Sequence, residues 1–176
     1  DATGPSYTIP SVLAADAGSY DVVVQNMLGS ATSAPATLTV NKAVAVVNVG
    51  NLAQVYDGSP RAVSVSTVPA GIGYTVIYEG GPTPPVDAGS YAIAVTVTDA
   101  NYTGSATETL VVARANAGVA LASLSSTYDG TPKPVTVTTV PAGLPFGLTY
   151  NGAPAVPTDA GSYAVVAVVD QRNHAG

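Results

Sequence analysis

The chain has 176 residues, of which only 9% are charged, and its five Lys and Arg against eleven Asp and Glu give a net charge of −6. So few basic residues provide no basic surface for nucleic acid or anionic lipid. Because the chain has no cysteine, a disulfide framework and thiol chemistry are excluded. No uninterrupted apolar run approaches the roughly 18 residues of a membrane-spanning helix, so we expect no membrane insertion.

The composition favours short strands joined by turns. Apolar residues make up 47% of the chain, and 18 Gly and 14 Pro interrupt segments rich in Val, Ala, Thr and Ser. β-Branched residues favour strands, whereas Gly and Pro favour the turns between them. The high apolar content with modest net charge also argues against disorder. We therefore predict an all-β fold built from small antiparallel β-sandwich modules in tandem.

The first segment, residues 1–41, contains the string Asp-Ala-Gly-Ser-Tyr at Asp16–Tyr20. The apolar alternation that follows predicts a half-buried strand with Tyr20, Val22 and Val24 on one face. This pattern, continued by Asn26, resembles the last strands of a bacterial immunoglobulin-like domain. Such domains often have a disulfide Cys where Val22 stands, so the resemblance implies a cysteine-free version stabilised by packing alone.

The remaining residues form two copies of one module, repeat one (residues 42–113) and repeat two (residues 114–176). A shift of 72 residues places Tyr56–Gly71 on Tyr128–Gly143 and Asp87–Gly104 on Asp159–Gly176 without a gap. Repeat one continues with Ser105–Val112, which alternates like a strand and has no counterpart in repeat two. We expect repeat two to lack its last strand and the chain to be part of a longer polypeptide.

Alternation predicts strands at matching places in the two repeats. In repeat one, Tyr91, Ile93, Val95 and Val97 share one face of a strand, as do Tyr163, Val165, Ala167 and Val169 in repeat two. Further strands are expected at 52–56 and 124–128, each closed by an Asp-Gly turn, and at 63–67 and 135–139, each ended by a Pro-Ala-Gly turn.

The recurring pentapeptide is interpreted as a structural corner at the start of a core strand. We expect its Asp to accept main-chain hydrogen bonds, its Gly to supply a special backbone shape, and its Tyr to bury the ring and bond the turn through the hydroxyl, as in the tyrosine corner of immunoglobulin-like sandwiches. The predicted corner residues are Asp16, Gly18, Tyr20, Asp87, Gly89, Tyr91, Asp159, Gly161 and Tyr163.

The two repeats resemble the MBG-type repeats of large bacterial surface and adhesin-like proteins. The motifs that carry this resemblance are Tyr-Asp-Gly-[Ser/Thr]-Pro, Thr-Val-Pro-Ala-Gly, Tyr-[Glu/Asn]-Gly and Asp-Ala-Gly-Ser-Tyr, which together span both copies. The resemblance implies a small sandwich-like module repeated on a secreted or cell-surface bacterial chain. It implies no reaction.

Residues suited to catalysis or metal binding are few. The single histidine, His174, stands where repeat one has Tyr102, so the module does not depend on it. We expect no cofactor, and no calcium-loop motif occurs, although calcium at a junction between domains stays a minor alternative. Single Asp residues that could contribute are Asp57, Asp87, Asp99, Asp129, Asp159 and Asp170. The aromatic pairs Tyr74/Tyr78 and Phe146/Tyr150 are interpreted as core residues rather than as a surface that binds sugars.

The sequence thus predicts a non-catalytic structural segment, such as part of a stalk, matrix or filament. One alternative is an adhesin module that binds a glycan or a host protein through the loops Gly80–Val86 and Gly152–Thr158, which differ between the copies. Another is an accessory domain of an enzyme. The expected partners are neighbouring domains of the same chain, and other copies in a fibre or lattice formed by strand addition. Val166 and Val168, on the outer face of repeat two, form a candidate contact face.

Overall fold

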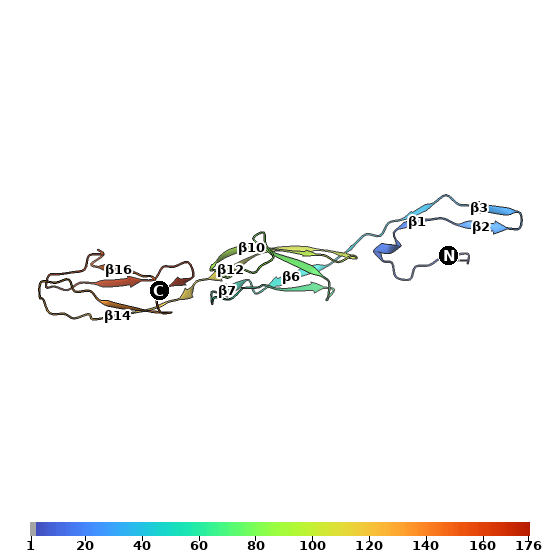
Figure 1. The fold of residues 1–176 in the computed structure, drawn as a ribbon. Helices are drawn as coiled ribbons and strands as arrows, with labels where there is room; N and C mark the ends of the chain where they lie inside the picture. Colours follow the sequence, from blue (N-terminus) through green and yellow to red (C-terminus); the bar gives the residue numbers. More distant parts are fainter. Residues whose placement is uncertain (1–2) are drawn as a thin grey trace. The chain divides into compact units, whose positions relative to one another are not determined.

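The computed structural model of the protein describes residues 3–176, and its first segment consists of one short turn of 3₁₀ helix and four short strands (Figure 1). The chain forms two compact units, and each is considered by itself: residues 1–49, 65–82 and 94–107, and residues 50–64, 83–93 and 108–176. The elements of the first segment are η1 (Ala14–Asp16), β1 (Gly18–Tyr20), β2 (Val23–Asn26), β3 (Gly29–Thr32) and β4 (Ala36–Leu38).

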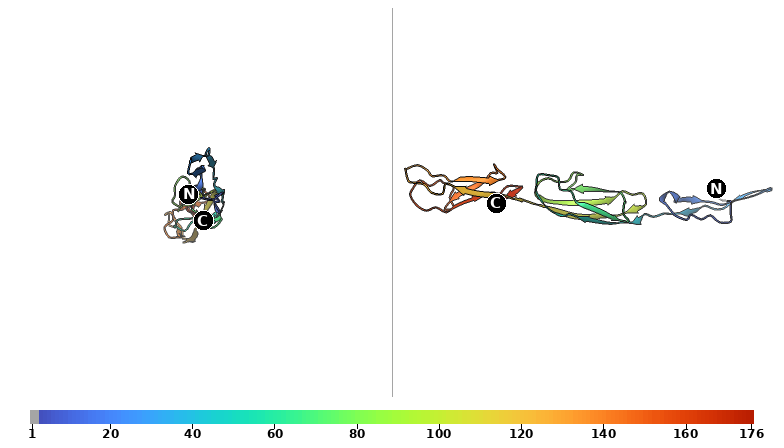
Figure 2. Two further views of the ribbon diagram at one scale, coloured as in Figure 1. Left: turned by 90° about the vertical axis from the view of Figure 1, so that its right-hand side faces the viewer. Right: turned by 90° about the horizontal axis from the view of Figure 1, so that it is seen from below.

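The prediction of a half-buried strand after the first corner is wrong. β1 pairs with β4 and β2 pairs with β3, each pair as a separate two-stranded sheet. Tyr20, Val22 and Val24 are 37%, 62% and 67% exposed. The β2–β3 hairpin, drawn in blue in Figure 2, is a sheet of its own, and all residues of its two strands are exposed.

Repeat one forms a four-stranded sheet with the order β7-β12-β10-β9, a two-stranded sheet of β6 and β8, and a short pair of β5 and β11. The strand bounds are β5 (Ala43–Val44), β6 (Val46–Gly50), β7 (Ala53–Val55), β8 (Ser64–Val68), β9 (Tyr74–Tyr78), β10 (Gly89–Val97), β11 (Tyr102–Thr103) and β12 (Ser105–Ala113).

Repeat two repeats this plan with fewer strands. β14 pairs with β15, β16 with β17, and β13 with β18. The bounds are β13 (Ala115–Asn116), β14 (Gly118–Ala122), β15 (Thr136–Val140), β16 (Gly147–Tyr150), β17 (Val165–Val168) and β18 (His174–Ala175). Residues 125–127, which follow β7 by 72 positions, form no strand, and the segment that would follow β12 by 72 positions lies outside residues 1–176.

The all-β prediction is confirmed, since residues 3–176 contain strands, turns and a single short 3₁₀ turn but no α-helix. Most pairs are antiparallel, whereas β5–β11, β7–β12 and β13–β18 are parallel. These parallel pairs are only two or three residues long, so the alternation pattern gave no sign of them. Nowhere in the described residues is there a helix that is long and apolar enough to span a membrane.

The inward face of β10 carries the core of repeat one, as its alternation predicts. Ile93, Val95 and Val97 are 2%, 0% and 9% exposed. On β12, Leu110 and Val112 are 0% and 2% exposed. Full burial of each such side chain is worth about 1.5–3 kcal/mol, so these two long strands supply most of the apolar stabilisation of the repeat.

The strand expected at 124–128 is absent from the structure. Its counterpart in repeat one, β7, is held by pairing with β12, in which Val111 lies beside Ala53. Residues 114–176 contain no strand in the position of β12, so the backbone of 124–128 has no partner and is not extended into a ladder. The same local pattern therefore gives a strand in one repeat and a loop in the other.

Candidate functional site: corners, junctions and an open cavity

The three pentapeptides share one hydrogen bond. In each, the tyrosine hydroxyl donates to the main-chain oxygen of the Asp four residues earlier, over 2.6 Å at Tyr20, 2.9 Å at Tyr91 and 3.1 Å at Tyr163. The tyrosine rings differ from the expectation, because Tyr91 is only half-buried and Tyr20 and Tyr163 are 37% and 36% exposed. The bond thus closes the turn from the surface of each module rather than from its core.

The corner glycines do not need an unusual backbone, contrary to the expectation. Gly18, Gly89 and Gly161 are not among the residues with positive φ. A Cβ added at Gly89 would lie 3.2 Å from the hydroxyl oxygen of Tyr91, and one at Gly161 would lie 3.4 Å from the ring of Tyr163. In the two repeats, glycine therefore leaves room for the tyrosine ring.

The corner carboxylates have three different environments. Asp16 accepts a hydrogen bond from the main-chain N–H of Leu13 over 2.7 Å, and so closes the turn around η1. Asp87 accepts one from the side-chain amide of Asn173 over 2.9 Å and lies 3.0 Å from a guanidinium nitrogen of Arg172. Asp159 is exposed beside the cavity described below.

Two asparagines, 72 positions apart, each bind the turn of the preceding domain. Asn101 accepts a hydrogen bond from the main-chain N–H of Ala14 over 3.2 Å, within the first compact unit. Asn173 accepts one from the main-chain N–H of Ala88 over 2.8 Å, within the second unit. The two asparagines come from equivalent hairpin turns, so one type of side-chain contact recurs at both junctions.

The basic residue of each linker bonds the same hairpin turn. The ammonium group of Lys42 donates to the main-chain oxygen of Asp99 over 2.8 Å. The guanidinium of Arg114, 72 positions later, donates to the main-chain oxygen of Gln171 over 3.4 Å and pairs with the carboxylate of Asp170. Each linker is therefore tied to the module that follows it.

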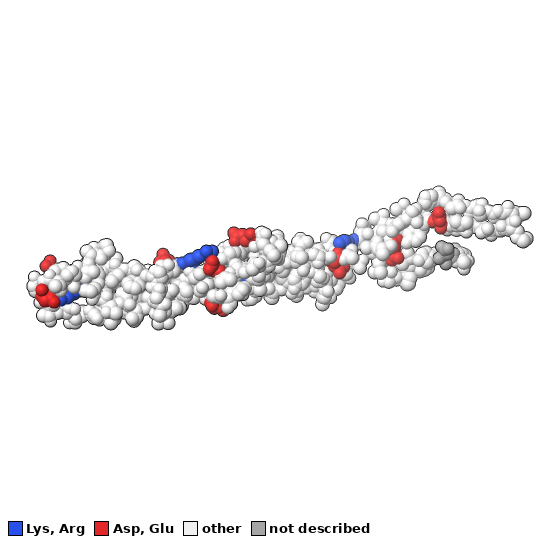
Figure 3. Space-filling model, viewed as in Figure 1, with Lys and Arg blue, Asp and Glu red and all other residues white. Residues whose placement is uncertain are grey.

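Charged side chains lie in small separate groups on the face drawn in Figure 3. Within residues 3–176, four of the five basic residues pair with an aspartate. These charges form no extended field of one sign on the drawn face.

The Asp-Gly turns hold carboxylates in their ionised form. The main-chain N–H of Ser59 donates to Asp57 over 2.9 Å, and this bond, followed by the charge of Arg61, lowers the pKa of Asp57. Lys133 hydrogen-bonds Asp129 and, with further bonds from Thr131, holds the pKa of Asp129 far below its usual range. Both carboxylates are exposed and fix their own loops.

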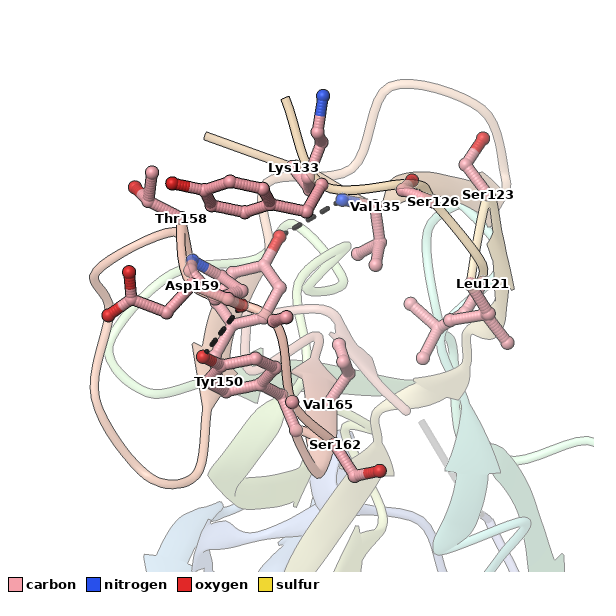
Figure 4. A pocket seen from close by; sticks show the side chains of 16 residues that line it. Leu121, Ser123, Ser126, Lys133, Val135, Tyr150, Thr158, Asp159, Ser162 and Val165 are labelled. Carbon is pink, nitrogen blue, oxygen red and sulfur yellow. Dashed lines mark hydrogen bonds between the residues drawn. The ribbon is translucent and has the colours of Figure 1, made fainter. Parts of the chain in front are cut away.

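Repeat two contains a cavity of about 530 Å³ between its two sheets and its corner loop (Figure 4). Its apolar lining includes Leu121 from β14, Val165 from β17 and the rings of Tyr128 and Tyr163. In Figure 4 the main-chain N–H of Val135 donates a hydrogen bond to the hydroxyl of Tyr150 over 3.0 Å, and this bond fixes the side of the cavity that these two residues form. The lining is mainly uncharged, and it mixes these apolar side chains with the hydroxyl groups of Ser123, Ser126 and Thr158.

In the part of the chain that the structure describes, candidate metal-binding groups do not come together. No three His, Asp or Glu side chains of these residues gather where they could hold one ion. His174 packs edge-on against Tyr56, with ring centres 5.3 Å apart. This ring contact gives the histidine a packing role.

The expected core aromatics divide into two classes. Tyr78 and Tyr150 are 8% and 3% exposed, as the core interpretation predicts. Tyr74 and Phe146 are 40% and 43% exposed, so the core interpretation is wrong for these two residues. In the candidate contact face, Val166 and Val168 are 53% and 47% exposed. That face is therefore accessible within repeat two, and its role in contact stays a prediction.

The family model of the MBG domain matches residues 45–116 and again residues 117–176, directly one after the other. The chain belongs to the MBG domain family. No curated protein and no solved structure gives a significant match to it. The two matched MBG domains cover most of the chain and contain the cavity, whereas Lys42 of the first linker-to-turn bond lies just before the first match.

The contacts at the two junctions, from the first segment to the first MBG domain and from the first MBG domain to the second, were not predicted. The sequence does contain a sign of the first contact: both repeats have Asn at the same position, Asn101 and Asn173, although the two residues before it differ between the repeats. Lys42 and Arg114 show the same signal through their shared charge. A comparison of the repeats for polar identities outside the strands would have found both pairs.

Proposed function

We propose that this chain is a non-catalytic structural segment of a large extracellular bacterial surface protein, in which MBG domains serve as fixed-length spacers. The carrying observation is the recurrence of the asparagine-to-turn bond at both junctions, from Asn101 to Ala14 and from Asn173 to Ala88. A spacer needs defined joints between its modules, whereas an enzyme needs convergent reactive groups. Short linkers with bonded basic residues support the same function.

Small-angle X-ray scattering of residues 1–176 tests the joints. For the Asn101→Ala/Asn173→Ala double variant we expect a broader distribution of interatomic distances than for the wild type, with each domain still folded by circular dichroism. Exposed Asn48 on β6 offers a matched control, and Asn48→Ala should scatter like the wild type. Equal flexibility of the wild type and the double variant would contradict the spacer function.

A second candidate is a binding module of the adhesin type. It is favoured by the exposed rings of Tyr74 and Phe146, which occupy the same repeat position and are 40% and 43% exposed. Exposed aromatic faces stack on sugars and on apolar peptide groups. A glycan array probed with residues 1–176 tests this function. Binding that Phe146→Ala and Tyr74→Ala abolish, while Val68→Ala leaves it intact, would favour the adhesin over the spacer.

A further inference from the structure

Repeat two has an Asn-Gly pair at the tip of a tight turn. The turn joins Tyr150, the last residue of β16, to Ala153, and two main-chain hydrogen bonds between these residues close it, over 2.7 and 3.0 Å. Asn151 and Gly152 hold the two central positions with φ of 49° and 82°, the left-handed values that such a turn requires. Both residues are exposed, so water reaches the side-chain amide of Asn151 and the peptide bond that follows it.

The side chain of Asn151 is held across the end of the β16–β17 ladder. Its Oδ1 accepts a hydrogen bond from the main-chain N–H of Ala164 over 2.8 Å, and its own main-chain N–H donates to the main-chain oxygen of Ala164, also over 2.8 Å. A donor at Oδ1 stabilises the negative charge that develops on this oxygen when a nucleophile attacks the side-chain carbonyl carbon, Cγ. The N–H of Ala164 thus activates the amide of Asn151.

The main-chain nitrogen of Gly152 is the nucleophile next to this amide in the chain. Within residues 3–176 its N–H has no main-chain acceptor, so no ladder bond has to break before it reacts. Glycine has no Cβ that would shield the nitrogen or restrict its approach to Cγ of Asn151. The turn therefore places an activated carbonyl beside an accessible nitrogen.

We propose that Asn151 is a site of spontaneous deamidation in folded repeat two. The nitrogen of Gly152 attacks Cγ of Asn151, the new N–Cγ bond closes a succinimide ring, and the Cγ–Nδ2 bond breaks. Nδ2 leaves as ammonia and takes up the proton that the glycine N–H loses. Water then adds to one of the two ring carbonyls and opens the ring, which gives either aspartate or β-linked isoaspartate at position 151.

Repeat one has a glutamate at the same place in its turn. Glu79 and Gly80 lie 72 positions before Asn151 and Gly152 and have φ of 46° and 93°, so this turn accepts a carboxylate. The aspartate product therefore keeps the turn, whereas isoaspartate adds a carbon atom to the main chain and moves the acceptor of the Ala164 N–H. Deamidation gives repeat two an irreversible change in charge and backbone, which goes beyond the spacer function and does not depend on it.

Other turns of the chain show which features distinguish Asn151. Asn51 is also exposed, with φ of 60°, but Leu52 follows it and its Nδ2 donates to a main-chain oxygen over 3.2 Å. Asp57 and Asp129 each precede a glycine, but the pKa of each is lowered, so both carboxylates are ionised and resist attack by a nitrogen. Asn51 is thus the matched control for the following residue, and the two aspartates are controls for the amide.

Peptide mass spectrometry of residues 1–176, kept at pH 8 under native conditions, tests the site. We expect Asn151 to exchange its amide for a carboxyl group at least about tenfold faster than Asn51, because a shielded nucleophile reaches its target far less often. The rate should rise with pH, since the N–H of Gly152 must lose its proton. Isoaspartyl methyltransferase should label the product in the aged wild type but not in Asn151→Gln.

Two outcomes would overturn the proposal. Equal native rates at Asn151 and Asn51 would show that the turn does not favour the reaction. A residue 151 that reacts in urea but stays intact in the native chain would show that the folded turn protects the amide.

Hydrogen exchange at Ala164 identifies the consequence for the fold. Its N–H should stay protected in Asn151→Asp and lose protection in the aged chain that contains isoaspartate, whereas protection retained in that chain would contradict the backbone change. None of these results bears on the joints at Asn101 and Asn173, so the spacer function is tested separately.

Discussion

Repeat one and repeat two place similar side chains at matching positions but bury them to different extents. Leu52 is half-buried, whereas its counterpart Leu124 is 65% exposed. Ile93 is 2% exposed, whereas Val165 is half-buried. The difference follows one strand, β12, which occupies the sheet of repeat one, because residues 114–176 do not include the segment that would follow β12 by 72 positions. Burial in this fold is therefore decided by a neighbouring strand that is distant in sequence.

Other parts of the two repeats are nearly the same. Thr67 and Thr139 are both 8% exposed, and Tyr78 and Tyr150 are 8% and 3% exposed. Val169 of repeat two is 1% exposed, so a small core exists there without β12. Each repeat thus contains a part that forms from its own strands, and a part that depends on the additional strand.

The largest expected effect comes from removing the leucine of β12. We expect Leu110→Ala to lower the free energy of unfolding of repeat one by about 2–5 kcal/mol, because a fully buried side chain leaves a cavity. Leu124→Ala is the matched control, and at 65% exposure it should cost less than about 0.5 kcal/mol. Urea unfolding followed by hydrogen exchange of peptides from each repeat measures both. Equal losses would show that Leu124 is buried in solution.

A second substitution should affect the two repeats alike, because it lies in the shared part. A Cβ at Gly104 would lie 2.5 Å from the main-chain oxygen of Ala45, and one at Gly176 would clash with that of Ala117. We expect Gly104→Ala to cost about 1–3 kcal/mol, since the clash is with backbone. The control Gly147→Ala meets no atom closer than 4.0 Å. A melting temperature of Gly104→Ala equal to that of Gly147→Ala would contradict the close approach.

Local patterns predicted those elements whose partners lie within the same module. The inward face of β10 and the turns after Thr67 and Thr139 follow from alternation and from Pro and Gly, and the structure contains them. Residues 124–128 were predicted as a strand for the same reason, and the prediction was wrong because a strand also needs a neighbour. Alternation describes which face is apolar, but not whether a second sheet covers it, as the exposed Val22 and Val24 show.

The candidate sites were less predictable than the strands. The tyrosine of each corner was identified from the recurring pentapeptide, and its bond to the Asp main-chain oxygen follows from the turn geometry. The joints at Asn101 and Asn173 depend on contacts between domains, which no pattern within one domain specifies. The cavity depends on the relation of β14 to β17, so it required the folded repeat.

The corners provide a third and smaller comparison. Tyr91→Phe removes a hydroxyl whose hydrogen bond is partly buried, and we expect a loss of about 0.5–1.5 kcal/mol in the free energy of unfolding. The bond of Tyr163 is exposed, so Tyr163→Phe should cost less because water replaces the lost partner. Thermal unfolding of the two variants measures the difference. A greater loss in Tyr163→Phe than in Tyr91→Phe would exclude burial as the cause.

The smallest expected effect distinguishes the two Asp-Gly turns by pH and salt. The pKa values of Asp57 and Asp129 are lowered in the folded protein, so each contributes stability above the usual carboxyl pKa of 3.8 and loses it as the pH falls towards the folded value. Asp57→Asn and Asp129→Asn should each flatten the decline in stability in acid.

Salt should separate these two carboxylates because their main partners differ. The bond from the main-chain N–H of Ser59 contributes most at Asp57, whereas the bond from the charged Lys133 contributes most at Asp129. Salt screens exposed charges, so 1 M NaCl should reduce the contribution of Asp129 more than that of Asp57. Unfolding measured between pH 2 and pH 7 at two salt concentrations tests this. An equal salt response in the two variants would mean that loop geometry, rather than the lysine charge, controls the acidity of Asp129.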